Sequence, residues 1–162
     1  MDDTLSVAQG PFAGLVPLGR DYAVLPIEQA FNWGECLASV ERGDWYVVAF
    51  RSVRRFGSDD SLLDELDGRA FAEASGHSGL LHYFKGEMDD ERRCLSMCIW
   101  EDRTRAGEAA TLPEHTAAIA IARATYTSYV LERYHLTKRD GSFELVELEP
   151  PQRSAAVDGR PA

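Results

Sequence analysis

The sequence of 162 residues contains no long apolar run: no window approaches the roughly 18 apolar residues in succession that mark a membrane-spanning helix. Its first ten residues, MDDTLSVAQG, are acidic and lack the basic and then apolar order of a secretion signal. We therefore expect a cytoplasmic protein that does not bind membranes.

Basic residues are scarce, with 17 Lys and Arg against 27 Asp and Glu, and the formal net charge is -10. This charge would repel a phosphate backbone, and the Arg54-Arg55 and Arg92-Arg93 pairs both lie near acidic clusters. We therefore expect no nucleic-acid partner. Only Lys85 and Lys138 are lysines, a skew that indicates a high-GC bacterial coding bias.

The three cysteines, Cys36, Cys94 and Cys98, are too few and odd in number for a disulfide framework. On a strand, the spacing of Cys94 and Cys98 separates them by about 13 Å, at roughly 3.3 Å per residue, so one metal ion cannot bridge them. We interpret them as buried apolar residues and expect no metal site. The sequence also lacks a nucleophile elbow, a phosphate loop, a dinucleotide fingerprint and a zinc cluster.

What the sequence does contain is a hydrophobic content of 44%, enough for the core of one domain. We interpret residues 1–44 as an N-terminal extension that packs on a domain spanning residues 45–149. Within the extension, residues 22–25 suggest a short strand and residues 32–42 a helix with an apolar stripe. The tail, residues 150–162, is rich in Pro, Arg, Ala and Gly, and we expect it to be disordered.

The domain is expected to contain alternating strands and helices with local start and stop signals. Ser58–Ser61 and Asp102 offer N-caps, Thr111 and Glu114 have capping-box spacing, and Asp140-Gly141 predicts a hairpin. The expected elements are strand 45–53, helix to Gly76, strand 80–87, strand 92–100, helix from Asp102 broken at 111–114 and ending near Ser128, strand 129–138 and strand 143–147.

The element order predicts an α+β fold of the ferredoxin-like βαββαβ type, with a four-stranded antiparallel sheet and an added C-terminal hairpin strand. The first and third strands are apolar on both faces, as expected for strands in the middle of the sheet. Two helices cover only one face of such a sheet. We therefore expect a second subunit to cover the other, apolar face, so that the two sheets of a homodimer pack together. The alternative is that the N-terminal extension covers this face.

Residues 45–138 resemble the dimeric α+β barrel superfamily, which includes the antibiotic biosynthesis monooxygenase-like domains. The resemblance rests on the element order, on the strand that ends in CIWED, and on the histidine of LPEHTAA in the second helix. It implies a dimeric α+β barrel, and either cofactor-independent oxygenation of polyphenols, haem degradation, or no enzymatic activity. Haem-degrading relatives bind iron through a histidine at a place similar to His115. In the oxygenases and in the haem-degrading relatives, an asparagine on the first strand and a tryptophan early in the second helix also matter. This sequence has neither residue at these places.

Two histidines are the candidate catalytic residues. His82 lies within strand 80–87, where it could act as a general base in a cavity between the sheets, or pair with a partner at a subunit seam. His115 could be the base or a haem ligand, or it could interact with nearby carboxylates at a helix start.

Aromatic residues and one arginine complete the predicted site. Tyr83, Phe84, Trp100 and Tyr126 could form the floor of a pocket for a flat substrate, although such residues are more often core. Arg133 shares a strand face with His135 and could bind a substrate anion, or pair across strands with Glu132 or Glu144.

These observations predict a protein that binds a small hydrophobic or aromatic molecule without a cofactor. It would act as a monooxygenase-like enzyme on a flat phenolic substrate, with His82 or His115 as the base. A non-catalytic ligand-binding or structural dimer is the alternative, and haem binding through His115 is the third.

Overall fold

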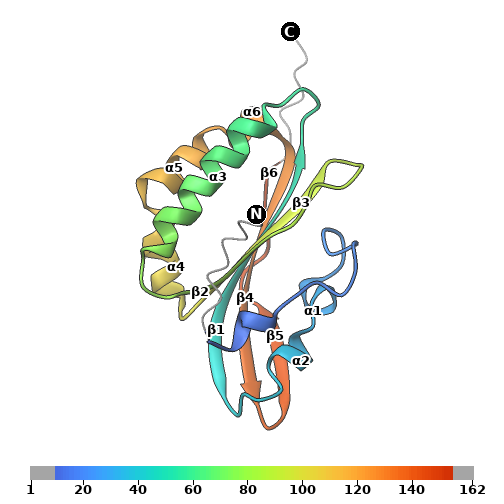
Figure 1. Ribbon diagram of the computed structural model, residues 1–162, viewed down its shortest axis with the longest axis vertical. Coiled ribbons are helices and arrows are strands. Elements are labelled where there is room, and N and C mark those ends of the chain that lie inside the picture. The colour runs from blue at the N-terminus through green and yellow to red at the C-terminus, as the bar shows by residue number, and fades with distance from the viewer. Residues whose placement is uncertain (1–9, 155–162) are drawn as a thin grey trace, which may run out of the picture.

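A twisted antiparallel sheet runs through the computed structural model, which describes residues 10–154 apart from the side chain of Arg123 (Figure 1). The strands lie in the order β2-β3-β1-β4-β5, and β6 pairs with β4 as well. Their bounds are β1 Gly43–Arg54, β2 Leu80–Lys85, β3 Arg93–Trp100, β4 Tyr126–Arg139, β5 Ser142–Glu147 and β6 Gln152–Ser154.

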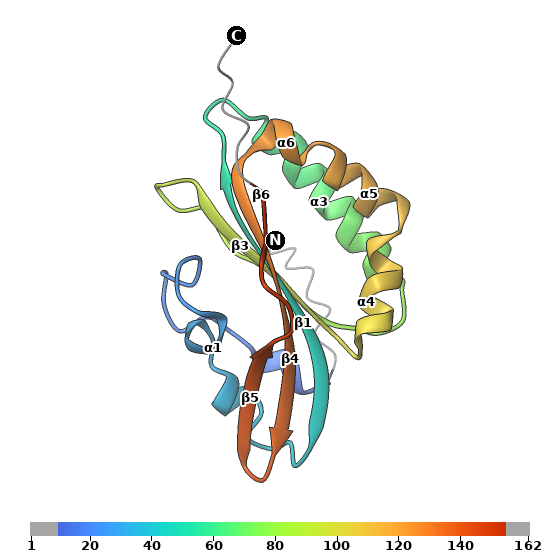
Figure 2. The ribbon, with the colours of Figure 1, turned by 180° about the vertical axis from the view of Figure 1, so that it is seen from behind.

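Helices lie on both sides of this sheet. Figures 1 and 2 show α3, α4 and α5 on one side and the short helices α1 and α2 on the other. The helix bounds are η1 Gly10–Gly14, α1 Ile27–Ala30, α2 Trp33–Cys36, α3 Asp60–Ser75, α4 Arg103–Ala110, α5 Pro113–Ala120 and α6 Ala122–Thr125. Within residues 10–154, none of these helices has the length and apolar character needed to cross a membrane.

The expected strand and helix order from residue 45 to residue 147 is confirmed, and β1 and β3 lie in the middle of the sheet. The second predicted helix is shorter than expected, because α5 ends at Ala120 and β4 already begins at Tyr126. β4 pairs with β1 along its whole length, with an irregularity where Arg54 meets Tyr126. This long pairing favours strand over helix for residues 126–128.

Two predicted helix starts are confirmed, those in which the capping side chain binds an amide three residues later in the chain. Asp59 accepts a hydrogen bond from the Leu62 amide at 2.9 Å, and Asp102 accepts one from the Arg105 amide at 2.9 Å. The predicted capping box of Thr111 and Glu114 is wrong. The Glu114 amide donates instead to Glu73 on α3 at 2.9 Å.

Residues 10–42, which we call the extension, cover the face of the sheet opposite α3 and α5. Phe12, Ile27, Phe31, Trp33 and Leu37 are at most 2% exposed and pack in one core with the sheet residues Val47, Ala49, Leu95, Met97, Ile99 and Leu136. The prediction of a homodimer rested on this apolar face. Because the chain itself covers the face, the homodimer stays a prediction that this face does not support.

A buried arginine fastens the extension to the sheet. Arg51 on β1 donates to the carbonyls of Ala23 at 2.8 Å and Leu25 at 2.7 Å, and it pairs with Glu132 on β4 at 2.8 Å. The Arg51 and Glu132 side chains are 15% and 12% exposed. The extension is thus held by charge-assisted hydrogen bonds as well as by apolar packing.

Inside the extension, local structure differs from the sequence-based expectation. Residues 22–25 form a turn rather than a strand, and the helix expected over residues 32–42 has only one turn, α2. Asn32 makes no cap: its side chain accepts from the Val16 amide at 2.8 Å and donates to the Gly14 carbonyl at 3.1 Å. The asparagine closes a loop instead of extending a helix.

The C-terminal part contains the predicted hairpin and one unpredicted strand. Asp140 and Gly141 have φ values of 48° and 83°, which suit the tight turn between β4 and β5. Residues 152–154 pair with β4 as β6, where we expected disorder. The remainder of the expected tail, residues 155–162, lies outside the described residues.

Candidate functional site

The two faces of the sheet differ sharply in accessibility. On the face under the extension, Val47 and Ala49 of β1 and Leu95, Met97 and Ile99 of β3 are 0% exposed. On the face toward the helices, their neighbours Val48, Phe50, Ser96 and Cys98 are all partly exposed, although they also lie on central strands. Among the described residues, the middle of the sheet is thus sealed on the extension side and partly exposed on the helix side, which we call the open face.

An aromatic group occupies one end of the open face. The ring centroids of Phe50 on β1 and of Tyr126 and Tyr129 on β4 lie 5.4 to 6.3 Å apart in edge-on or tilted arrangements. All three residues are partly buried. Burial, together with the charge of Asp67, raises the pKa of the Tyr126 hydroxyl to about 12, so this phenol stays protonated. The group offers ring surface to a flat ligand.

A carboxylate from α3 gathers several of the predicted residues. The Tyr83 hydroxyl donates to Asp67 at 2.9 Å, and its ring stacks on Phe71 at 4.7 Å. Lys85 also pairs with Asp67, at 2.9 Å. Burial and the Asp67 charge raise the pKa of Tyr83, so this phenol is a hydrogen-bond donor and no base. The pairs satisfy one another and fix α3 on β2.

His115 lies near the same carboxylate, at the start of α5. The residue is exposed, and partial burial of the ring lowers its pKa, which the charges of Glu73 and Asp67 oppose. The charge of Asp67 thus acts on His115, Tyr83 and Tyr126, and of these three Tyr83 is hydrogen-bonded to it. That these residues form one site stays a prediction.

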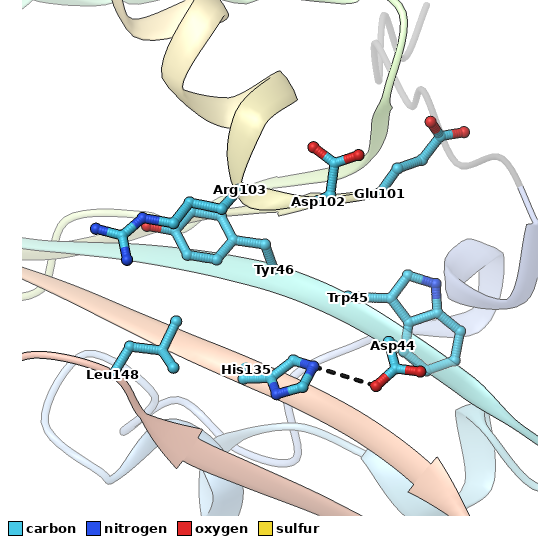
Figure 3. Close-up of a pocket in the computed structure, with 8 residues that line it drawn as sticks. All are labelled: Asp44, Trp45, Tyr46, Glu101, Asp102, Arg103, His135 and Leu148. Atoms are coloured by element: carbon cyan, nitrogen blue, oxygen red, sulfur yellow. Dashed lines mark ion pairs between the residues drawn. The ribbon is translucent and has the colours of Figure 1, made fainter.

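A pocket of about 240 Å³ opens at the other end of the strands (Figure 3). Its lining residues come from β1, β4, the start of α4 and the chain after β5: Asp44, Trp45, Tyr46, Glu101, Asp102, Arg103, His135 and Leu148. Figure 3 shows His135 and Asp44 at one end, and the Tyr46 hydroxyl with the Arg103 guanidinium at the other.

His135 and Asp44 form an acid–base pair in this pocket. The imidazole Nε2 lies 3.2 Å from the Asp44 carboxylate, and both side chains are about half exposed, at 45% and 52%. The hydrogen bond from Arg139 lowers the pKa of Asp44, so the carboxylate is ionised. An ionised partner on Nε2 holds the proton there and leaves Nδ1 as the basic nitrogen.

Tyr46 forms the floor of the pocket and is 6% exposed. Burial raises the pKa of its hydroxyl, and the nearby guanidinium groups of Arg133 and Arg103 oppose that shift. Trp100 lies opposite Tyr46 in the strand register, is 4% exposed and packs in the same core cluster beside it. Arg133 stands beside the pocket, 3.8 Å from Glu149.

His82 and Phe84 do not belong to this site. Phe84 packs under the extension against Phe31 at 5.0 Å, and His82 pairs in register with Ile99 on the same sealed face. His82 and His115, the two alternative bases predicted from the sequence, therefore lie on opposite sides of the sheet. Both ring nitrogens of His82 are buried, and among the described residues they have no hydrogen-bond partner.

The sequence profile of the PB2B2.08-like family matches residues 3–150, which is most of the chain. The chain belongs to the PB2B2.08-like family. No curated protein matches the sequence.

Two solved structures of low sequence identity are similar to this PB2B2.08-like protein. Protein SO0527 from Shewanella oneidensis is 14% identical with a TM-score of 0.52, and the match covers 60% of this chain and 99% of that one. SnoaB from Streptomyces nogalater, a cofactor-independent oxygenase, is 17% identical with a TM-score of 0.45, over 60% of this chain and 95% of that one. The likeness to SO0527 supports an α+β fold of this class and nothing finer.

The surroundings of His115 are negatively charged. The Glu73 and Asp67 carboxylates act on this histidine, and haem binding through it stays a prediction. The pocket of Figure 3 is lined by other residues. Among the described residues, no group of three His, Cys, Asp or Glu is placed to hold a metal ion.

Sequence reasoning missed Asp44, Tyr46, Arg103 and Asp67. It placed His135 on one strand face with Arg133 but expected Glu132 or Glu144 as the partner. The register decides otherwise: His135 lies opposite Tyr46 on β1, and Asp44 is two residues before Tyr46 at the strand end. Only the long-range pairing of β1 with β4 reveals the pair. The tyrosine alternating with buried valines was the one local signal.

Proposed function

We propose that the protein binds a small flat aromatic or phenolic molecule on the open face of its sheet. The observation that carries this proposal is the contrast between the two faces of the central strands, which leaves Val48 and Phe50 partly exposed beside Tyr126 and Tyr129. Apolar and aromatic side chains with a few convergent polar groups are the usual lining of small-molecule sites.

We further propose that a phenolic ligand also enters the pocket of Figure 3, at the other end of this face, where His135 takes a proton from its hydroxyl. A histidine is basic near neutral pH, and Asp44 would orient the imidazole and stabilise its protonated form. Tyr46 and Arg103, at the other end of the pocket, are donors that would hold a second polar group of the ligand. The base that we propose is thus His135, in place of the sequence-based alternatives His82 and His115.

Cofactor-free oxygenation, in which the deprotonated ligand itself reduces O₂, would begin with this proton transfer. The second candidate function is ligand binding without catalysis. It is favoured by the mutual pairing of Tyr83, Lys85 and Asp67, which leaves none of these groups free to act on a substrate.

Binding is tested by titrating the protein with 2-naphthol and following the fluorescence of the ligand. We expect Phe50→Ala to weaken binding about tenfold, which corresponds to about 1.4 kcal/mol and to the loss of one aromatic contact. Phe56→Ala is the matched control, because that ring is 94% exposed in a loop. Equal affinities of the Phe50→Ala variant and the unchanged protein would refute the open face as the site.

Proton transfer is tested separately, through the absorbance of the naphtholate. Bound 2-naphthol should ionise at lower pH than free 2-naphthol, and His135→Gln should abolish that difference while changing the affinity little. If the variant binds 2-naphthol and ionises it like the unchanged protein, His135 is not the base. If the unchanged protein binds it without any shift, the non-catalytic function holds.

A further inference from the structure

Two arginines beside the pocket share a single carboxylate of the chain. Glu149 pairs closely with Arg103 at the first turn of α4 and lies 3.8 Å from Arg133 on β4. It belongs to the segment between β5 and β6 and directly follows Leu148, which lines the pocket. The carboxylate thus links a helix and a strand at the Tyr46 end of the pocket.

The charges of this cluster are unbalanced. Two guanidinium groups face one carboxylate, and the other side-chain partners of Arg133 are the neutral Gln152, at 3.3 Å, and the Tyr46 hydroxyl. The nearby Asp102 caps α4 through its side chain, and Figure 3 shows Glu101 and Asp102 pointing away from the Tyr46 hydroxyl. The cluster therefore attracts a further anion, or a different one.

The internal carboxylate is loosely held. Arg103 is 64% exposed and Glu149 38%, and exposed ion pairs of this kind contribute little to stability. Arg133 is better fixed, with 21% exposure. A ligand carboxylate could therefore replace Glu149 without disturbing the sheet.

We propose that Arg103 and Arg133 form a carboxylate-binding subsite of the pocket, which Glu149 occupies in the ligand-free protein. The inference rests on the proposed function and narrows its ligand class to aromatic or phenolic carboxylates. The ring would lie toward Tyr46 and the open face, and the carboxylate would displace Glu149 from the two guanidinium groups. Glu149 then acts as an internal competitor that weakens the binding of every such ligand.

The test compares 3-hydroxy-2-naphthoate with 2-naphthol, which lacks the carboxylate. Glu149→Gln should tighten the binding of 3-hydroxy-2-naphthoate by about threefold to tenfold, because the competing charge is removed, and leave 2-naphthol unchanged. Glu147→Gln is the matched control: it alters the net charge equally from the exposed end of β5. Arg133→Lys should remove most of the preference for 3-hydroxy-2-naphthoate. Lysine keeps the positive charge but cannot form the two parallel hydrogen bonds that a guanidinium donates to a carboxylate.

The outcomes separate this inference from the proposed function. If Glu149→Gln and Glu147→Gln shift the affinity for 3-hydroxy-2-naphthoate equally, the effect is one of general charge and the subsite is overturned. The proposed function would still stand if Phe50→Ala weakens the binding of 2-naphthol. Binding of neither compound would overturn both. A preference for 3-hydroxy-2-naphthoate that grows only in the Glu149→Gln variant supports the subsite.

Discussion

At the scale of single residues, His82 is the most unusual side chain, because it is 7% exposed and both of its ring nitrogens lack partners among the described residues. A buried unsatisfied donor or acceptor costs about 1 to 3 kcal/mol. We expect His82→Leu to raise the free energy of unfolding at pH 8 by an amount of that order. Urea unfolding measures it, and a loss of stability would show that the ring has a partner after all.

The same histidine predicts how stability depends on pH. Burial lowers the pKa of His82 in the folded protein below its value of about 6.5 in the unfolded chain. The unfolded state therefore takes up more protons as the pH falls. The free energy of unfolding that depends on neutral His82 is fully present above about pH 6.5 and is lost as the pH falls from there through the folded pKa. Both His82→Leu and His82→Gln should reduce this loss of stability at acid pH. Only His82→Leu should also raise the free energy of unfolding at pH 8.

Residue identity alone did not predict the face of the candidate site. The predicted cavity lies between two packed sheets, whereas strand alternation places Tyr83, Trp100, Tyr126 and Arg133 on the face toward the helices. His82 was a candidate base because it lies within its strand, on a face that could line a cavity between the sheets, and local pattern cannot tell a sealed face from an open one. That distinction comes from the extension, which is remote in sequence.

At the scale of elements, α3 is the long helix of the open face and contains Gly68 near its middle. A Cβ at this position would meet no atom within 4 Å, and the residue is exposed. We expect Gly68→Ala to stabilise the protein by about 1 kcal/mol, because alanine loses less backbone entropy in a helix. Thermal or urea unfolding tests this.

Gly79 is the matched control, at the turn that leads into β2. Its φ is 106°, and an added Cβ would lie 2.7 Å from the Arg105 side chain. Gly79→Ala should therefore destabilise the protein, in contrast to Gly68→Ala. Equal effects of the two substitutions would contradict the distinct roles of these glycines.

Elements were predictable where their signals are local. Asp59 and Asp102 cap the helices that follow them, and Asp140-Gly141 turns the last hairpin, each within a few residues. Elements with distant partners were not. Asn32 bonds to residues 14 and 16, and the start of α5 is capped from α3 by Glu73. No local pattern announces such contacts.

At the scale of the whole molecule, Arg51 connects the extension to the sheet. Removing one partner of a buried pair leaves the other charge uncompensated, at a cost of about 3 to 5 kcal/mol. We expect Arg51→Met to destabilise the protein by about 3 kcal/mol and to speed proteolysis within residues 15–42. Arg51→Met combined with Glu132→Gln should recover part of that loss.

The control for this prediction is Arg69→Met on α3. Arg69 pairs with Glu65, but both side chains are more than half exposed, at 57% and 58%. This substitution makes the same change in net charge and should cost less than about 0.5 kcal/mol. If the two arginine variants unfold alike, Arg51 does not anchor the extension.

The extension also bears on whether the chain self-associates. Its side chains Phe12, Phe31, Trp33 and Leu37 are almost completely buried on the sheet, and each fully buried apolar side chain contributes about 1.5 to 3 kcal/mol. A tethered segment acts at an effective concentration on the order of millimolar. A second subunit at micromolar concentration cannot compete with it for that face. We therefore expect the full chain to sediment as a monomer.

A full-length variant tests this exclusion directly. Phe31 is 2% exposed between the extension and the sheet, and Phe31→Asp would place a charge in that core, where burial costs several kcal/mol. The extension should detach, expose Val47, Ala49 and Met97, and drive concentration-dependent association. A full-length protein that sediments as a dimer, with Phe31→Asp leaving its association unchanged, would place the predicted homodimer interface on another surface, because the covered face would then play no part in it.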